Sequence, residues 1–120
     1  MSDTKSVSVS EIFSLQRPEQ KPRTKNQLWI KDVGYDEAPW YSERMGLLEL
    51  EDFLKVAGER IDYVKIATTQ VLGHPENWLK RKIALYQEHS IQPYLDHGYF
   101  LRAFRLGVVD EAIEAGAALG

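Results

Sequence analysis

The chain has 120 residues, of which 43% are hydrophobic and 28% are charged, so it can bury the core of one small domain and keep a polar surface. Its formal net charge of −3 argues against nucleic acid or an anionic membrane as the main partner. It contains no cysteine, which excludes disulfides, thiolate zinc sites and a cysteine nucleophile. No apolar run approaches the roughly 20 residues of a membrane span, and no secretory signal is visible. We therefore expect a cytoplasmic protein.

The N-terminal stretch is polar and interrupted by prolines. Residues 1–26 are rich in Ser, Lys, Gln and Pro, and Pro18 and Pro22 prevent a regular helix there. This composition predicts a flexible arm over residues 1–26, ahead of a folded domain over residues 27–120. A tail that binds a partner is the alternative interpretation.

The rest of the chain alternates strand and helix patterns. Short apolar segments, suited to buried strands, occupy residues 27–32, 61–67 and 91–95. Amphipathic helical spacing covers residues 47–59, 76–89, 99–106 and 109–118. Residues 35–46 and 68–75 are predicted loops. Pro93 weakens the prediction of the third strand, because proline removes one donor from the hydrogen-bond ladder.

The strands start about thirty residues apart and each is followed by a helix. This rhythm is typical of parallel α/β folds, so we expect the three strands to be parallel neighbours in chain order. Three parallel strands cannot close a barrel. An exposed strand edge would remain, and we expect further sequence after residue 120, self-association with a partner chain, or an open arrangement.

Several segments carry a family resemblance. Residues 54–65, LKVAGERIDYVK, resemble the point in the phosphosulfolactate synthase family where a helix ends in Gly and an Ile-Asp-x-Val-Lys strand follows. Residues 80–91 resemble the next helix and strand start of that family, and residues 109–111 with the final Leu-Gly resemble the approach to its fourth strand. The resemblance covers roughly residues 21–120, about the first half of a family member.

The resemblance implies an α/β protein of the (β/α)₈ TIM-barrel type, of which this chain would supply the first three or so βα units. It also implies a lyase activity with magnesium as the cofactor. The enzymes of the family add sulfite to phosphoenolpyruvate and form phosphosulfolactate on the way to coenzyme M. The active site of a barrel lies at the C-terminal ends of its strands, so candidate site residues are expected at those positions.

At these strand ends the sequence departs from the family's motifs. Residues 32–34 read Asp-Val-Gly in place of Asp-Lys-Gly, so one cation is lost. Residues 67–71 contain no glycine, whereas the family has a glycine-rich stretch there and glycines allow the backbone to approach an anion closely. Residues 94–101 lack the family's acidic residue but contain Asp96 and His97. A second hypothesis is therefore a relative without this activity, acting as a stress-related or interaction protein.

Five residues are candidates for a site that binds a small phosphorylated carboxylate. Lys65 would hold the anion as a point charge and act in catalysis. The alternative is that Lys65 has only a structural role, as the ion-pair partner of a carboxylate such as Asp32. Asp32 and Asp96 would hold Mg²⁺, or would only cap a loop and a turn. His97 would act as an acid or base, because histidine as a residue type titrates near neutral pH, or would only take part in the turn before Gly98. Arg102 would bind the substrate, or would simply lie on the surface.

Overall fold

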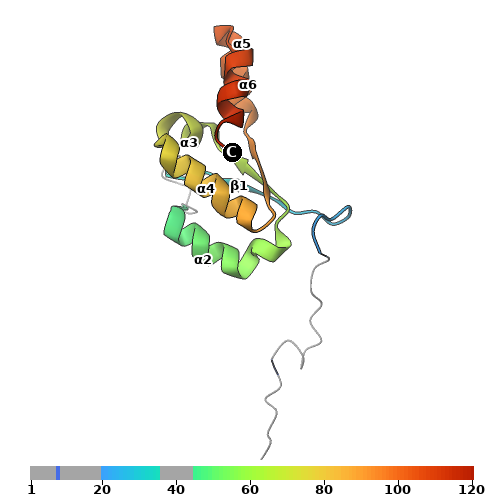
Figure 1. Ribbon diagram of the computed structural model, residues 1–120. Helices are drawn as coiled ribbons and strands as arrows, with labels where there is room; N and C mark the ends of the chain where they lie inside the picture. Colours follow the sequence, from blue (N-terminus) through green and yellow to red (C-terminus); the bar gives the residue numbers. More distant parts are fainter. Residues whose placement is uncertain (1–7, 9–19, 36–44) are drawn as a thin grey trace, which may run out of the picture.

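The computed structural model describes residue 8, residues 20–35 and residues 45–120 (Figure 1). The described elements are β1 (Trp29–Asp32), α2 (Leu47–Ala57), the 3₁₀ turn η1 (Gly58–Arg60), β2 (Tyr63–Ile66), α3 (Thr68–Gly73), α4 (Glu76–Glu88), β3 (Gln92–Leu95), α5 (His97–Leu106) and α6 (Val109–Ala117). None of the helices in these ranges has the length and apolar character that a membrane span requires.

The sheet has three strands in the order β1-β2-β3, and both neighbouring pairs are parallel. Asp32 at the end of β1 is in register with Ile66 on β2, which is in register with Leu95 on β3. The predicted strands, their parallel direction and their order are therefore confirmed. Pro93 is tolerated because β3 has a neighbour on one side only in the described part of the chain.

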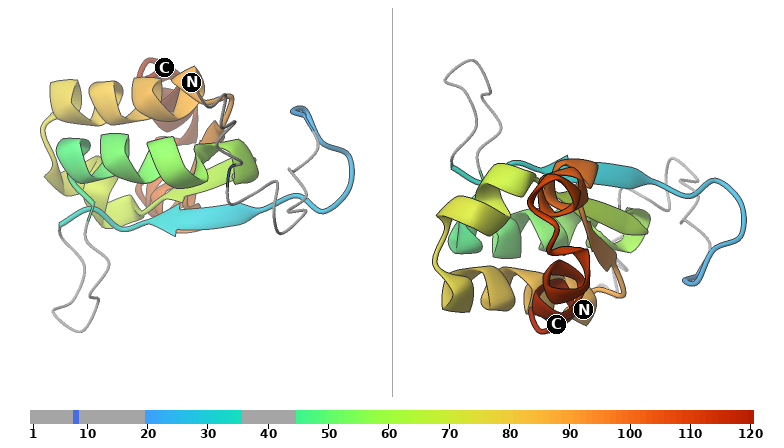
Figure 2. Two further views of the ribbon diagram at one scale, coloured as in Figure 1. Left: turned by 90° about the horizontal axis from the view of Figure 1, so that it is seen from below. Right: turned by 90° about the horizontal axis from the view of Figure 1, so that it is seen from above.

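The two faces of the sheet differ because side chains alternate along each strand. Helices α2 and α4 lie on the same face (Figure 2), where Val64 and Ile66 are fully buried. The core between sheet and helices includes Leu50, Leu54, Ile61, Val64, Ile66, Leu79, Ile83, Tyr86 and Ile91. We call the opposite side the open face; by alternation and register it carries Trp29, Lys31, Tyr63, Lys65, Gln92 and Tyr94.

The predicted helices form with small changes at their ends. The first ends at Ala57, and residues 58–60 tighten into η1. Helix α4 begins after Pro75, with Glu76 in its first turn, where a negative charge complements the helix dipole. Helix α5 starts two residues earlier than predicted, at His97. These differences of one or two residues are ordinary for helix ends, which fray and tighten.

The prediction of a loop over residues 68–75 is wrong for residues 68–73, which form α3. Gln70 is fully buried on this short helix, and its Nε2 donates a hydrogen bond of 3.0 Å to the carbonyl oxygen of Asp32. The local sequence TTQVLG disfavours a helix, because Thr and Val lose side-chain freedom there. The buried contact of Gln70 therefore stabilises a helix that local preference does not predict.

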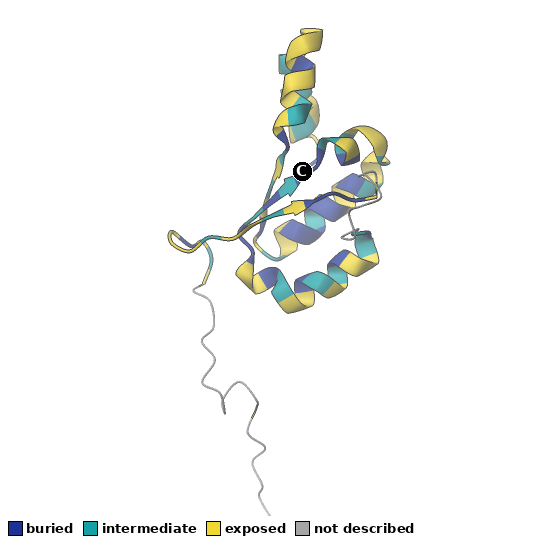
Figure 3. Ribbon diagram, turned by 180° about the vertical axis from the view of Figure 1, so that it is seen from behind, coloured by how far each residue is buried: buried dark blue, intermediate teal, exposed yellow. Residues whose placement is uncertain are grey.

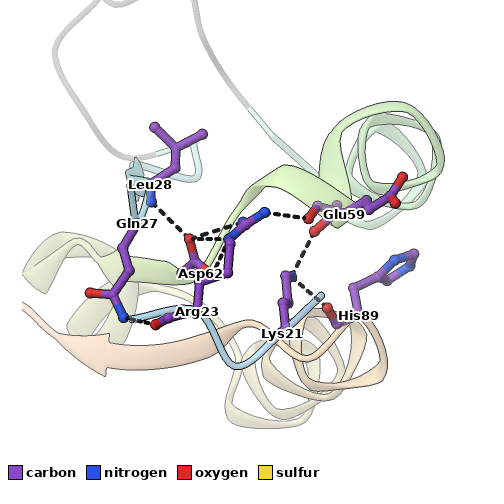
Figure 4. Close-up of polar contacts among 8 residues, drawn as sticks. Lys21, Arg23, Gln27, Leu28, Glu59, Asp62 and His89 are labelled. Carbon is purple, nitrogen blue, oxygen red and sulfur yellow. Dashed lines mark hydrogen bonds and ion pairs between the residues drawn. The ribbon is translucent and has the colours of Figure 1, made fainter. Parts of the chain in front are cut away.

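Part of the predicted arm contacts the folded domain near the N-terminal ends of the strands (Figure 4). We call residues 21–27 the clasp. Nζ of Lys21 donates hydrogen bonds of 2.7 Å to the carbonyl oxygens of Gly58 and His89. It thus joins the ends of α2 and α4, whose last carbonyls lack partners within the helix. Burial lowers the pKa of Lys21, and the nearby charge of Asp62 opposes that effect.

The second contact of the clasp is a buried ion pair. Nη2 of Arg23 lies 2.9 Å from Oδ2 of Asp62, and the two side chains are 4% and 6% exposed. The same carboxylate accepts a hydrogen bond of 2.8 Å from the backbone N–H of Leu28. Lys21 and Arg23 therefore pack with the folded part, although the sequence placed them in the arm. Residues 1–7 and 9–19 of that arm lie outside the described residues.

Candidate functional site

Four side chains meet at the C-terminal end of the sheet, and we call them the strand-end cluster: Lys31, Lys65, Asp96 and His97. Lys31 on β1 is in register with Lys65 on β2, so both lie on the open face. Asp96 follows β3 directly. Its Oδ2 lies 3.7 Å from Nζ of Lys31, and its Oδ1 lies 3.9 Å from Nζ of Lys65. One carboxylate thus faces two ammonium groups.

The cluster carries more positive than negative charge. Burial raises the pKa of Asp96, but the charges of Lys65 and Lys31 lower it by more, so its pKa is below the ordinary value. Asp96 is therefore ionised at neutral pH and offsets one of the two lysines. The lysine side chains are 42% and 35% exposed, so their remaining charge is accessible to an anion. Both ion-pair distances are long, which leaves the ammonium groups free to reorient toward a ligand.

His97 extends the cluster toward solvent. Its Nδ1 lies 2.8 Å from Oδ1 of Asp96, and its side chain is 86% exposed. A carboxylate beside an imidazole can orient the ring. Oγ1 of Thr68, at the start of α3, is buried without a hydrogen-bond partner in the described part of the chain. A Cβ on Gly98 would lie 2.8 Å from this oxygen, so the hydroxyl group lies beside the start of α5.

Asp32 lies on the other face of the sheet and belongs to a buried network. It is 1% exposed. Its Oδ1 accepts hydrogen bonds from Nζ of Lys82 at 2.9 Å and from the backbone N–H of Gly34 at 3.0 Å. Its Oδ2 accepts a bond of 2.6 Å from the hydroxyl of Tyr86. The structure therefore pairs Asp32 with Lys82 on α4 and pairs Lys65 with Asp96.

Lys82 is the centre of this network. Its ammonium group also donates to Oε1 of Gln70 at 2.7 Å and to the carbonyl oxygen of Met45 at 2.6 Å. Burial lowers the pKa of Lys82, against the opposing charge of Asp32. Burial and the same carboxylate raise the pKa of Tyr86 far above its ordinary value. Every donor of the ammonium group is used, so the network holds together the ends of β1, α3 and the segment that starts α2.

Lys82 is 0% exposed, although a run of three basic residues, Lys80 to Lys82, is typical of a solvated helix face. A helix places residues three and four apart on the same side. Lys82 is three residues after Leu79 and four before Tyr86, and both are buried. This spacing predicts a buried position for Lys82, whereas its charge by itself predicts an exposed one.

Lys31 is a member of the strand-end cluster that was not among the predicted site residues. It occupies the third position of β1, as Lys65 does in β2. Because alternate residues share a face, this equal position could have identified the lysine pair. Arg102, by contrast, is exposed on α5 about one and a half turns beyond His97. It forms no hydrogen bond or ion pair within the described ranges.

The described residues do not assemble the predicted magnesium ligands. Residues 20–35 and 45–120 contain no group of three or more His, Asp or Glu side chains that could hold a metal ion. Both carboxylate oxygens of Asp32 accept hydrogen bonds inside the protein. Asp96 lies between two lysines, and a cation there would be repelled by both. The open face is thus better suited to an anion than to Mg²⁺.

Comparison with known protein families identifies the family of the chain. A model of the family described as (2R)-phospho-3-sulfolactate synthase (ComA) matches residues 16–120. Curated proteins gave no match to the chain. The family match extends over most of the sequence and includes both lysines and Asp96. The chain therefore belongs to the (2R)-phospho-3-sulfolactate synthase family.

Proposed function

We propose that the strand-end cluster binds a small phosphorylated carboxylate of the phosphoenolpyruvate type. The observation that carries this proposal is the pair Lys31 and Lys65, in register on the open face and sharing the single carboxylate of Asp96. Phosphate and carboxylate groups are both anionic, so two ammonium groups side by side can contact both ends of one ligand. The family match supports this ligand class.

We further propose that the chain is a phosphosulfolactate synthase-like lyase and that it forms the first βα units of a (β/α)₈ TIM barrel. In such a barrel the open face would point into the interior, and the strand-end cluster would lie at the C-terminal end, where barrel enzymes carry their active sites. As part of the same proposal, the protein acts in the cytoplasm in the biosynthesis of coenzyme M.

The cluster could assist the addition of sulfite in two ways. A carbon–sulfur bond forms when the sulfur electron pair attacks the methylene carbon of phosphoenolpyruvate. The electron pair of the double bond then moves to the carbon that bears the carboxylate, and this carbon takes a proton. Lys65 would stabilise the negative charge that builds up on the carboxylate. His97 would donate the proton, because its Nδ1 lies 2.8 Å from Oδ1 of Asp96, which orients the ring, and its side chain reaches solvent.

Two features limit the activity we expect. Val33 stands where the family enzymes carry a lysine, and it is buried. Helix α3 begins at Thr68, directly after β2 and Ala67. This part of the chain therefore has no glycine-rich loop whose backbone could approach the ligand closely. We therefore expect weak affinity and little sulfite addition. The same two features favour the second candidate, a non-catalytic family relative acting as a stress-related or interaction protein.

Titration calorimetry with phosphoenolpyruvate, with and without Mg²⁺, tests the proposal. Lys65→Ala and Lys31→Ala should each weaken binding by about tenfold or more, because each removes one charged contact. Lys25→Ala is the matched control, since Lys25 is an exposed lysine of the clasp near the opposite end of the sheet, and it should bind like wild type. Equal heats for wild type and Lys65→Ala would remove Lys65 from the site.

An assay of phosphosulfolactate formation separates the two candidates. Binding that depends on Lys65, with little product, supports a weakened enzyme site. No binding by wild type at millimolar ligand favours the non-catalytic relative. Robust product formation by the 120-residue chain would show that the altered motifs are dispensable.

A further inference from the structure

Tyr35, three residues after the end of β1, is held by the side chain of His74, which follows α3. The backbone N–H of Tyr35 donates a hydrogen bond of 3.1 Å to Nε2 of His74. The two rings are nearly parallel, with 5° between their planes and 6.2 Å between their centroids. We call this contact the His74 latch. It joins the segment that leaves β1 to the connection between α3 and α4.

The latch requires one protonation state of the imidazole. Because Nε2 accepts a hydrogen bond, it carries no proton, and the neutral ring has its proton on Nδ1. When the ring binds a second proton, both nitrogens become donors and Nε2 can no longer accept from Tyr35. Histidine as a residue type titrates near neutral pH, so this hydrogen bond, unlike one to a carbonyl oxygen, depends on pH. Helices α3 and α4 each combine buried and exposed residues (Figure 3), and His74 between them is half-buried.

The turn between β1 and the latch is tightly packed. Gly34 has a φ of 61°, in the left-handed region that favours glycine. A Cβ at this position would lie 3.0 Å from Nε2 of His74 and 2.8 Å from Cδ of Gln70. The backbone N–H of Gly34 donates a hydrogen bond of 3.0 Å to Oδ1 of Asp32. The turn is thus held at Gly34 by the buried network of Asp32 and at Tyr35 by His74.

A fixed positive charge lies near the latch. The centroid of the His74 ring is 4.8 Å from that of Trp78 on α4, and Nζ of Lys82 lies 4.6 Å from the Trp78 ring centroid. A protonated His74 would share this aromatic ring with the ammonium group of Lys82, and the two like charges would repel each other. Lys82 is fully buried and bonded to Asp32 at 2.9 Å, so its charge stays in place.

Other charged or titratable groups also face the latch. Glu76 and Tyr99 line one cavity with His74. The charge of Glu76 favours a protonated ring, but Glu76 also pairs with Lys80 at 3.3 Å. The hydroxyl of Tyr99 donates a hydrogen bond of 2.7 Å to a carbonyl oxygen of α6.

The side chain of Tyr35 reaches the start of α2. A Cβ on Gly46 would meet both the hydroxyl of Tyr35 and Oε2 of Glu49, so Glu49 is the charged group beside the phenol. Tyr35 therefore contacts His74 through its backbone and ring, and lies beside α2 through its hydroxyl.

We propose that the His74 latch is a pH-sensitive switch, which holds Tyr35 against α3 and α4 while His74 is neutral and releases it when His74 binds a proton. Release leaves the N–H of Tyr35 to water and frees its ring from those of His74 and Trp78, whose centroids lie 6.2 and 6.1 Å away. Gly34 and Asp32 keep their own hydrogen bonds, so the change is local. The switch involves no ligand and therefore does not depend on the proposed function.

NMR on the whole 120-residue chain tests the tautomer and the hydrogen bond between about pH 8 and pH 5. At the upper end, ¹⁵N–¹H correlations of the His74 ring should show a proton on Nδ1 and none on Nε2. On acidification, the amide resonance of Tyr35 should shift with the same midpoint as the His74 ring. Its protection factor against hydrogen exchange should fall by about fivefold or more, as expected for the loss of one hydrogen bond.

Two substitutions at His74 separate the hydrogen bond from the ring contact. His74→Gln keeps an oxygen that can accept from Tyr35 but does not titrate, so the Tyr35 amide should stay protected over the whole range. His74→Phe keeps a ring but has no acceptor, so the amide should lack this protection at every pH. His89→Gln is the matched control, because His89 lies at the other end of α4, and the Tyr35 amide should respond to pH as in wild type.

Three results would overturn the inference. A neutral His74 with its proton on Nε2 would show that the ring does not accept from Tyr35, and this measurement on wild type decides the matter even if a variant fails to fold. A Tyr35 amide that titrates in His74→Gln as it does in wild type would assign the pH response to another group. Wild-type protection of the Tyr35 amide in His74→Phe would show that the hydrogen bond does not hold the segment.

Discussion

At the level of single side chains, Asp32 and Lys82 form a buried ion pair in which each charge is stabilised by the other. Both side chains are 0% exposed, so neither charge can be solvated by water. The attraction between them, with hydrogen bonds from Tyr86 and to Gln70, offsets the cost of burial. Removing one partner leaves the other charge buried and unpaired.

Lys82→Met should therefore lower the free energy of unfolding by about 3–5 kcal/mol, measured by urea denaturation at pH 7. Lys80→Met is the control on the same helix: Lys80 is exposed and pairs with Glu76 at 3.3 Å, so its loss should change stability by less than about 0.5 kcal/mol. The double variant Asp32→Asn with Lys82→Met should lose less than the sum of the two single changes. Strictly additive losses would mean that the two charges are not coupled.

At the level of elements, the clasp connects the start of the folded chain to the ends of α2 and α4. Burial raises the pKa of Asp62, but hydrogen bonds from Arg23 and Leu28 and the charge of Arg23 lower it by more. The folded protein therefore binds a proton on Asp62 less tightly than the unfolded chain. By linkage, the stability from this group is complete above the ordinary carboxyl pKa of about 3.9 and is lost as pH falls through the lower folded value.

Asp62→Asn should reduce the free energy of unfolding at pH 7. It should also make that free energy fall less steeply as the pH is lowered. Unfolding free energies of wild type and variant, measured in urea from neutral pH down to about pH 2, should converge toward the acid end. Some dependence on pH remains in the variant, because the pKa of Asp96 is also lowered. Parallel curves for the two proteins over the whole range would show that Asp62 does not contribute to acid sensitivity.

At the level of the whole molecule, we expect the cooperatively folded unit to begin at the clasp. Residues 1–19 are poor in apolar groups, and Lys21 and Arg23 make the contacts with the folded domain. Deletion of residues 1–19 should therefore change the melting temperature by less than about 5 °C, equivalent to roughly 1 kcal/mol. Deletion of residues 1–26, which removes both contacts, should lower it by clearly more. A large drop with the shorter deletion would contradict this boundary.

Much of the fold could be predicted from local patterns. The spacing of strands and helices predicts the parallel sheet and its order, because a strand followed by a crossover helix returns parallel to the first strand. Lys65 and Asp96 could be placed near one another for the same reason, since the C-terminal ends of parallel strands share an edge. The family membership follows from short segments around residues 54–65 and 80–91.

Which charges pair could be learned only from the packed molecule. Asp32 and Lys31 are adjacent in sequence, yet alternation directs Asp32 to the buried Lys82 and Lys31 to Asp96. The positions of strands and helices can be read along the chain, because that information is local and periodic. The partner of each buried charge depends instead on how helices pack on one face of the sheet. The contact of Gln70 that stabilises α3 depends on the same packing, and no local pattern records it.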